Sequence, residues 1–526
     1  MIGRLLSYFR TGPDKPLLEN HDEISKAYER KRTSVFLSLL FGYSFFYVTR
    51  LSFSVAKKSM IDANVLNAEQ MGKIGFAFFI TYAFGKLTNG FLADRSNIRR
   101  FMSTGLLVSS LIVILFGFTR WFLLFVVLWG INGWFQSMGS APSGASISQW
   151  FSNKERGTRY GLWSMAHSIG EGVTFAVTAV VVAAVGWQWG FWSAGLISIV
   201  VALVMFRTLA DRPRTYGLPL VADYKNDHPG AVDLEQDSVN KAQFGVVKNP
   251  YVWILGISCT AMYVARYGVN SWGVLYLQEA KSYPLVTAGF ILFLAKIMET
   301  IGAVSSGMVS DYVFKSRRNI STLVYGLIQI FGLVILFFAP STYLFSLDES
   351  VVSYLTEGNV GMALMNEFKD KGIVLKEGAR ISVVGEGDEK EWYIDYNKWY
   401  LSWKGFRIEH NGANLNVSRK FSVLHLVGIS LFGFGLGGLL VFLGGLIAID
   451  ICSKRASGAA MGLVGMFSYV GAAFQDWISG SLIEAGKMTV NGRTIHDFNN
   501  AFYFWLGAAI FAVLVSCTLW KVKPKD

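Results

Sequence analysis

Two arginines inside apolar stretches are the residues whose type and spacing point most directly to chemistry. Arg50 lies in FFYVTRLSF, and Arg266 lies in YVARYGVNSW, 216 residues further on. An Arg at the centre of a bilayer costs about 2.5–3.5 kcal/mol on insertion scales, so such residues usually have a function. Guanidinium groups are permanently charged and donate paired hydrogen bonds to oxyanions. The two arginines therefore predict a shared site for a phosphate dianion, between two related halves of the chain.

An alternative interpretation is that each arginine pairs with a buried carboxylate and only fixes the packing. Glu171, Glu299 and Asp476 lie in apolar stretches and are the candidate partners. The repeated position of the two arginines favours the anion site over this alternative.

Other polar residues in apolar stretches are candidates for the same site. Lys86, in TYAFGKLTNG, would add charge to the site or form an ion pair between helices. His167, in SMAHSIGEG, would bind a ligand or pack through a hydrogen bond. Three tyrosines share helix faces with the arginines, because they precede them by three or seven residues. They are Tyr43, Tyr47 and Tyr263.

A second repeated motif pairs an Asp with basic residues after an apolar stretch. GFLADRSNIRR contains Asp94, Arg95, Arg99 and Arg100, and GMVSDYVFKSRR contains Asp311, Arg317 and Arg318. Anchoring at a cytoplasmic membrane surface explains the basic residues but not the repeated Asp. The motif therefore predicts gating ion pairs rather than ligand contacts.

Catalysis and tightly bound cofactors are not expected. The chain has three Cys without a C-x-x-C pair and no His cluster, so no metal site is predicted. It also lacks a nucleophile–base constellation and a GxxxxGK[ST] phosphate loop. The chain is therefore not expected to be an enzyme or to be powered directly by ATP.

Apolar stretches long enough to cross a bilayer position these residues. Of 526 residues, 52% are hydrophobic and only 16% are charged, whereas soluble domains carry about 25% charged residues. A spanning helix needs roughly 20 apolar residues. Twelve stretches qualify, near 34–56, 70–93, 101–119, 121–149, 160–185, 189–207, 251–278, 286–311, 320–340, 423–450, 458–484 and 500–520. The sequence predicts an all-α membrane protein of twelve transmembrane helices.

The distribution of Lys and Arg predicts the orientation of these helices. With the N-terminus inside, 27 of the 48 basic residues lie on the cytoplasmic side and only 6 in short loops on the other side. Basic residues concentrate in cytoplasmic loops, so both termini are predicted to be cytoplasmic. The net charge of +12 is thereby explained by the membrane, without a nucleic-acid partner.

Internal repeats divide the chain into two pseudo-symmetric six-helix halves with one insertion. The offset between repeated motifs grows from about 217 to 300 residues beyond the ninth span, and segment 341–422 accounts for the difference. Alternating sequence in this segment predicts a small β-rich extracytoplasmic insertion with a brief helix near 358–370. It would be a passive elaboration or a domain that guides a partner or substrate. The predicted parts are 1–33 (cytoplasmic), 34–207 (first half), 208–250 (cytoplasmic linker with short helices), 251–340 (helices seven to nine), 341–422 (insertion), 423–520 (helices ten to twelve) and 521–526 (cytoplasmic tail).

Six ordered motifs resemble the organophosphate:inorganic phosphate antiporter family of the major facilitator superfamily. They are FYVTRLSFSVA, YAFGKLTNGFLADRSN, GWFQSMGSAPSG, SQWFSNKERG, WSMAHSIGEG and YVARYGVNSWGVLYL. The resemblance covers all twelve spans but not 341–422, and it implies the major facilitator fold. DKPLLENHDEISKAY and DRPRTYGLPLVADY are most similar to the hexose-phosphate transporter and regulatory sensor branch.

The resemblance implies an inner-membrane protein of bacteria, monomeric, that exchanges an organic phosphate for inorganic phosphate by alternating access. Hexose 6-phosphate is the expected substrate. Arg50, Arg266, Lys86 and His167 match the family's phosphate-binding residues, and Tyr43, Tyr47, Tyr82, Tyr263 and Tyr469 match its lining tyrosines. The main alternative is a sensor of external glucose 6-phosphate that signals to a membrane histidine kinase. A proton-coupled carrier of another anion is a third hypothesis.

Several positions depart from the family's pattern. Ser140 and Ala141 replace part of a WPP motif, and Ser164 stands where the glycerol-phosphate branch has Asn. Glu171 replaces a usual Gly, and Lys296 adds a charge to the eighth span. These departures concern the choice of substrate more than the phosphate site.

Overall fold

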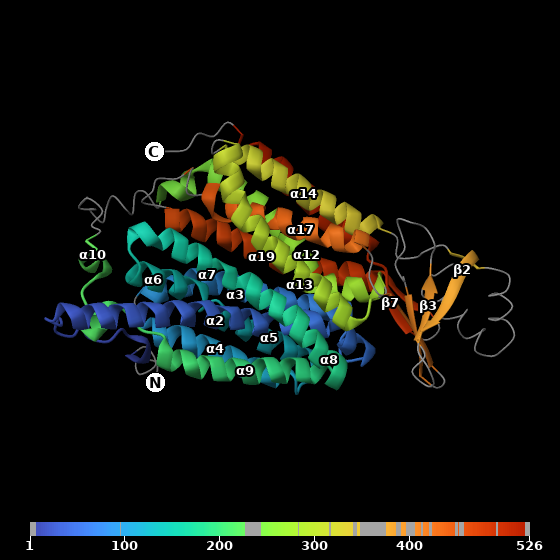
Figure 1. The fold of residues 1–526 in the computed structure, drawn as a ribbon, viewed down its shortest axis with the longest axis horizontal. Coiled ribbons are helices and arrows are strands. Elements are labelled where there is room, and N and C mark those ends of the chain that lie inside the picture. Colours follow the sequence, from blue (N-terminus) through green and yellow to red (C-terminus); the bar gives the residue numbers. More distant parts are fainter. Residues whose placement is uncertain are drawn as a thin grey trace.

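The computed structural model describes most of the helical chain and part of the insertion. The described residues are 7–94, 96–226, 244–281, 283–314, 317–339, 345–347, 375–384, 391–395, 406–411, 414–419, 423–447, 451, 457–490 and 493–520. Long helices run side by side, and the two chain ends lie at the same end of the bundle (Figure 1). Termini at one end are what an even number of spans requires.

Each predicted span corresponds to a helix or to a short series of helices. The first half contains α2 (His21–Asp62), α3 (Ala68–Asp94), α4 (Ile98–Phe116), α5 (Phe122–Gln136) with α6 (Ser140–Trp150), α7 (Asn153–Val173) continued by η1 (Thr174–Thr178) and α8 (Ala179–Val185), and α9 (Trp187–Thr208). The second half contains α12 (Pro250–Glu279), α13 (Leu285–Met308) continued by η3 (Val309–Val313), α14 (Arg318–Phe338), α17 (Val423–Val441) continued by η4 (Phe442–Leu446), α19 (Ser457–Ala485) and α20 (Asn499–Cys517).

Local sequence explains several helix ends. Asn97 and Asn249 precede α4 and α12, where each side chain accepts a hydrogen bond from the backbone of the first turn. Gly186 separates α8 from α9 and has a φ of 96°, a conformation that favours glycine. Helix α2 begins at His21, well before the apolar stretch that starts near residue 34.

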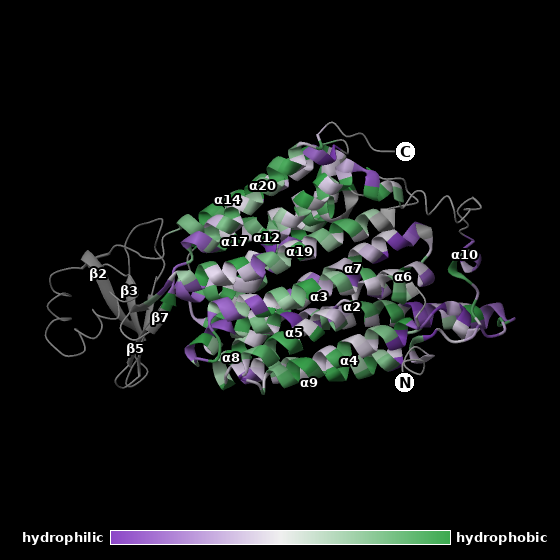
Figure 2. Ribbon diagram, turned by 180° about the vertical axis from the view of Figure 1, so that it is seen from behind, coloured by the Kyte–Doolittle hydropathy of each residue, from purple (hydrophilic) through white to green (hydrophobic). Residues whose placement is uncertain are grey.

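Ten of the described helical segments are long and apolar enough to cross a membrane. Helices α3 and α19, with 27 and 29 residues, are not among these ten. They carry charged residues such as Lys86 and Asp476, and each packs against the other half. Hydrophobic residues predominate along α4 and α9, whereas the N-terminal end of α2 is hydrophilic (Figure 2). The prediction of a membrane protein with two six-helix halves is confirmed.

The two halves meet along α3 and α19, α2 and α12, and α7 and α13. Glycines allow the closest approaches, because a side chain at Gly72 would meet the backbone of Asp476 and Gly480. Lys58 of α2 pairs with Glu279 of α12 at 3.2 Å, and the Ala68 amide donates to Glu484 of α19 at 2.9 Å. These contacts lie at the end of the bundle opposite the termini. At that end, the halves are held together.

The insertion contains β1 (Phe345–Leu347), β2 (Leu375–Val384), β3 (Glu391–Asp395), β4 (Phe406–Asn411) and β5 (Asn414–Arg419). They form one sheet in chain order at the end opposite the termini (Figure 1). Pairs from β2 to β5 are antiparallel, as predicted, but β1 pairs with β2 in parallel. The helix predicted near 358–370 falls outside the described residues. A hairpin that was not predicted, β6 (Lys487–Val490) with β7 (Arg493–His496), links α19 to α20.

The linker between the halves packs on the termini end of the first half. Its described elements include η2 (Pro213–Tyr216) and α10 (Val221–Tyr224), both short. Residues 227–243 of the predicted linker lie outside the described residues. Tyr224 stacks on Tyr28 of α2 with ring centroids 4.2 Å apart. Asp211 accepts hydrogen bonds from Asn97 Nδ2 at 3.0 Å and from the Ile98 amide at 3.2 Å. The linker is therefore tied to the starts of two spans.

Candidate anion-binding site

Arg50 is a buried cation of the first half with few polar partners. Its side chain comes from α2, twelve residues before that helix ends at Asp62, and the residue is only 4% exposed. Nη2 donates to Gln136 Oε1 of α5 at 3.4 Å, but Nε and Nη1 have no hydrogen-bond partner among the described residues. The guanidinium instead lies over the rings of Tyr47 and Tyr82, 4.7 and 4.5 Å from their centroids. Two donors of a buried guanidinium are thus available to an anion.

A run of tyrosines connects Arg50 with the second half. Tyr82 of α3 lies 4.3 Å from Tyr469 of α19, measured between ring centroids. Tyr469 in turn lies 5.5 Å from Tyr263 and 6.2 Å from Tyr267, both of α12. Arg266 lies over the last two rings, at 5.6 and 5.7 Å. The five predicted tyrosines are all buried or packed on the core: Tyr43, Tyr47, Tyr82, Tyr263 and Tyr469.

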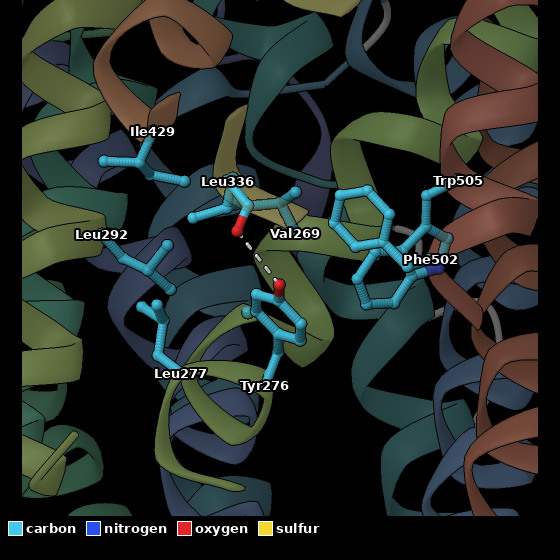
Figure 3. Close-up of a pocket in the computed structure, with 9 residues that line it drawn as sticks. Val269, Tyr276, Leu277, Leu292, Leu336, Ile429, Phe502 and Trp505 are labelled. Atoms are coloured by element: carbon cyan, nitrogen blue, oxygen red, sulfur yellow. Dashed lines mark hydrogen bonds between the residues drawn. The ribbon is translucent and has the colours of Figure 1, made fainter. Parts of the chain in front are cut away.

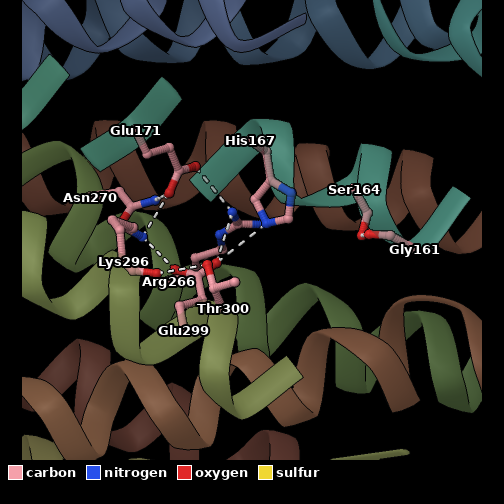
Figure 4. A network of polar contacts seen from close by, with 9 residues as sticks. All are labelled: Gly161, Ser164, His167, Glu171, Arg266, Asn270, Lys296, Glu299 and Thr300. Carbon is pink, nitrogen blue, oxygen red and sulfur yellow. Dashed lines mark hydrogen bonds and ion pairs between the residues drawn. The ribbon is translucent and has the colours of Figure 1, made fainter. Parts of the chain in front are cut away.

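Arg266 differs from Arg50 because it has carboxylate partners (Figure 4). Its Nη2 lies 3.0 Å from Glu171 Oε1 and 3.3 Å from Glu299 Oε1. Lys296 bridges the same two carboxylates, with Nζ 2.7 Å from Glu171 Oε2 and 2.6 Å from Glu299 Oε2. Asn270 Nδ2 donates to Glu171 Oε2 at 3.3 Å. Arg266 therefore has the buried carboxylate partners expected from the alternative interpretation, in which each arginine forms an ion pair that fixes the packing.

Lys86 and His167 flank this arrangement. Lys86 Nζ lies 5.1 Å from the centroid of the Tyr469 ring. His167 Nε2 lies 3.6 Å from Glu299 Oε1, and its ring is 6.1 Å from that of Tyr47. These positions bring all four predicted phosphate ligands to the same group of rings and carboxylates.

The charges of this group do not cancel. Arg50, Lys86, Arg266 and Lys296 supply four positive charges, and Glu171 and Glu299 supply two negative charges. Counted over these six residues, the excess is two positive charges, which equals in size the charge of a phosphate dianion. Buried charge in excess of its partners is costly and favours binding of a counter-ion.

Some residues of the group were missed as ligands by the sequence analysis. Gln136 contacts Arg50, Asn270 contacts Glu171, and the buried hydroxyl of Tyr267 has no hydrogen-bond partner among the described residues. Asn270 lies four residues after Arg266, so helical spacing places it one turn along the same face. A search for polar residues one turn from each arginine would have found it.

The predicted gating motif lies at the termini end of the bundle. Asp94 ends α3 and Asp311 lies in η3, but their side chains and all of Arg95 are outside the described residues. Arg100 donates to the Tyr8 carbonyl at 2.9 Å, and Arg318 donates to Ser310 Oγ at 2.8 Å. The Nε of Arg99 has no hydrogen-bond partner among the described residues, and Arg317 is exposed. Gating ion pairs stay a prediction.

A small apolar pocket in the second half does not resemble an anion site. Its lining includes Val269, Leu292, Ile429 and Trp505, and the Tyr276 hydroxyl within it donates to the Leu336 carbonyl at 3.2 Å (Figure 3). It has no charged residue in its lining. Among the described residues, no group of His, Cys, Asp and Glu could hold a metal ion.

The described helices and central cations define a multi-pass membrane protein, and comparisons with known proteins identify its family. Residues 39–366 match the Major Facilitator Superfamily. A bacterial homologue of the lysosomal transporter Spinster, in an inward-facing and unoccupied conformation, has a similar fold, with a TM-score of 0.61 and 15% identity over 94% of this chain and 99% of that one.

Two curated relatives are more similar in sequence. The "Probable hexose phosphate transport protein" of Chlamydia muridarum is 30% identical over 96% of this chain and 94% of its own length. The "Membrane sensor protein UhpC" of Escherichia coli is 34% identical over 61% of this chain and 74% of its own. The chain belongs to the major facilitator superfamily, a family of transporters rather than enzymes, and within it to the organophosphate:inorganic phosphate antiporter branch.

Proposed function

We propose that the protein exchanges an organic phosphate, hexose 6-phosphate, for inorganic phosphate. Arg50 supports this proposal most directly. Its Nε and Nη1 are buried without partners among the described residues, while the surrounding charges leave two positive charges in excess. A phosphoryl group offers the oxygens and the double negative charge that such a site requires. The name of the Chlamydia relative, which aligns along 96% of this chain, supports a hexose phosphate as the organic substrate.

In this proposal, Arg50 and Arg266 bind the phosphoryl group from the two halves, with Lys86 and His167 beside them. The tyrosines surround the ligand, and Tyr267 contributes a free hydroxyl. Alternating access would open each end of the bundle in turn. The contacts between halves at the end opposite the termini close that end, so the site would open toward the termini, on the cytoplasmic side of a bacterial inner membrane.

Transport by purified protein in liposomes tests the exchange. Liposomes loaded with inorganic phosphate are expected to take up labelled hexose 6-phosphate, and Arg50→Lys should abolish uptake because a lysine cannot make the paired contact. Arg120→Lys, in an exposed loop, is the matched control and should transport normally. Uptake that needs no internal phosphate would contradict the exchange.

The sensor hypothesis has weaker support. The sensor relative aligns with only 61% of this chain, whereas the transporter relative aligns with 96%. Binding of glucose 6-phosphate without uptake, together with activation of a co-reconstituted membrane histidine kinase, would favour the sensor.

A further inference from the structure

Glu171 connects the two halves through the group that the proposed function assigns to phosphate. It lies on α7 of the first half, and its side chain is only 1% exposed. Its partners Arg266, Asn270 and Lys296 come from α12 and α13 of the second half. Figure 4 shows the carboxylate reaching across from α7 toward these donors.

The contacts of Glu171 match those expected of a phosphoryl group. One oxygen accepts from the Arg266 guanidinium at 3.0 Å, and the other lies 2.7 Å from Lys296 Nζ. A bound phosphate would likewise place different oxygens on cations of the second half while Arg50 holds it from the first. Arg50 has no carboxylate partner among the described residues, so it has no comparable competitor.

We propose that Glu171 is a built-in counter-anion of Arg266, which phosphate must displace in order to bind. This proposal rests on the proposed function, because it takes Arg266 as a phosphate ligand. Phosphate would first contact Arg50 and then replace the Glu171 oxygen at Arg266. The displaced carboxylate keeps Lys296 and Asn270 as partners, so no unpaired buried charge results.

Glu171 and Glu299 therefore have different roles although both contact Arg266. Glu299 and Lys296 are three residues apart on α13, and Arg266 lies on α12 of the same half. Glu299 thus neutralises cations within the second half. Glu171 instead connects the two halves, because it reaches from the first half to Arg266 and Lys296 of the second. Bound phosphate would replace this connection at Arg266. In this view Glu171 sets the affinity for phosphate and holds the two halves together at the phosphate site while no phosphate is bound.

Binding of inorganic phosphate to the purified full-length protein tests the proposal. By calorimetric titration, Glu171→Gln should bind phosphate about tenfold more tightly than the original protein, the change expected from removing one competing ion pair. Glu171→Asp keeps the charge but is one methylene shorter, so it cannot reach both cations equally well. It should also bind more tightly, by severalfold. Glu69→Gln, which removes a surface partner of Lys73 at 2.7 Å, is the control and should bind like the original.

Thermal unfolding provides a second readout. Without phosphate, Glu171→Gln should unfold at a lower temperature, because the connection between halves is lost. Saturating phosphate should stabilise this variant more than the original protein. If Glu171→Gln binds phosphate more tightly but Glu171→Asp binds it with the affinity of the original protein, only the net charge of the site matters. That result would overturn the proposed displacement of Glu171 by phosphate.

Unchanged or weaker phosphate binding by both variants would also overturn it. If Glu171→Gln does not fold, Glu171→Asp decides the question alone. Failure of the proposed function looks different. In that case the original protein and Glu69→Gln would bind no phosphate, or Arg50→Lys would bind it normally.

Discussion

Lys57 of α2 lies with its Nζ 3.2 Å from the centroid of the Trp272 ring of α12. The Nε1 of the same indole donates a hydrogen bond to Asp476 Oδ1 of α19 at 2.9 Å. Lys57 and Asp476 are 1% and 3% exposed. A buried lysine of one half thus lies on an aromatic ring of the other half, and that ring is fixed by a carboxylate, at the end of the bundle that is closed.

Replacing Lys57 should loosen this closed end. Lys57→Met removes the cation–π contact with Trp272, which is worth about 2 kcal/mol when desolvated. Spin labels at the exposed Ala63 and Met488, one on each half, should then show a longer or broader distance distribution. Lys73→Met, which removes a surface lysine of α3, should leave the distribution unchanged. Equal distributions for both variants would show that Lys57 does not hold this end.

The two central arginines should respond differently to the same substitution. Arg266→Gln leaves Lys296 as the one lysine or arginine among the described residues that pairs with Glu171 and Glu299, so we expect a loss of about 3–5 kcal/mol in the free energy of unfolding. Arg50→Gln removes a cation that has no carboxylate partner among the described residues, and it should cost little or no stability. Thermal unfolding followed by tryptophan fluorescence measures both. Equal losses of stability in Arg266→Gln and Arg50→Gln would contradict the difference in carboxylate partners between the two arginines.

Two glycines of α7 provide a matched pair for testing helix packing. A side chain at Gly170 would meet the Ser44 carbonyl of α2, whereas Gly161 has no atom within 4 Å of the equivalent position. Gly170→Ala should therefore destabilise the protein by about 1–3 kcal/mol through overpacking. Gly161→Ala should be neutral or stabilising by about 0.5–1 kcal/mol, because alanine favours the helix. Chemical denaturation in detergent compares the two, and a Gly170→Ala variant as stable as Gly161→Ala would contradict the close contact.

The pH dependence of stability should reveal the buried Asp211. Burial raises the pKa of the Asp211 carboxyl above its ordinary value, although it accepts hydrogen bonds and lies next to Arg212. Between the ordinary and the raised pKa, the folded protein binds more protons than the unfolded chain. Stability should therefore fall as the pH rises through this window, which begins at about pH 4.

Asp211→Asn removes this titration and keeps an acceptor for the Ile98 amide. Melting temperatures of the original protein should thus decrease more steeply with rising pH in this window than those of the variant. Parallel curves would contradict the role of Asp211.

Much of the helical fold could be predicted from the sequence because spanning helices depend on length and apolarity. All twelve predicted segments correspond to described helices, and the polar α3 and α19 were included because their apolar runs are long. Pairing in the insertion was predicted less well. The parallel contact of β1 with β2 joins residues 30 apart, such as Phe345 and Leu375, and no local signal indicates it.

The candidate site was predicted in its members but not in its internal contacts. Helical spacing and the repeat identified Arg50 and Arg266 as equivalent, yet within the described part of the chain only Arg266 has carboxylate partners. Glu171 lies 95 residues from Arg266 in the chain, and Glu299 lies 33 residues from it. Which buried carboxylate meets which cation depends on how α7, α12 and α13 pack together, and a single sequence carries no direct record of that packing.

The length of α2 has a mechanical consequence. Its 42 residues correspond to about 63 Å of continuous helix, twice the thickness of a bilayer core. The same helix carries Arg50 twelve residues before its end and Arg32 eleven residues after its start. Arg32 forms an ion pair with the Glu155 carboxylate of α7. If the first half tilts when the site around Arg50 binds or releases phosphate, the N-terminal end of α2 therefore moves farther than Arg50 does. A fluorophore attached to the N-terminal end of α2, outside the lipid bilayer, would therefore report each conformational step of transport.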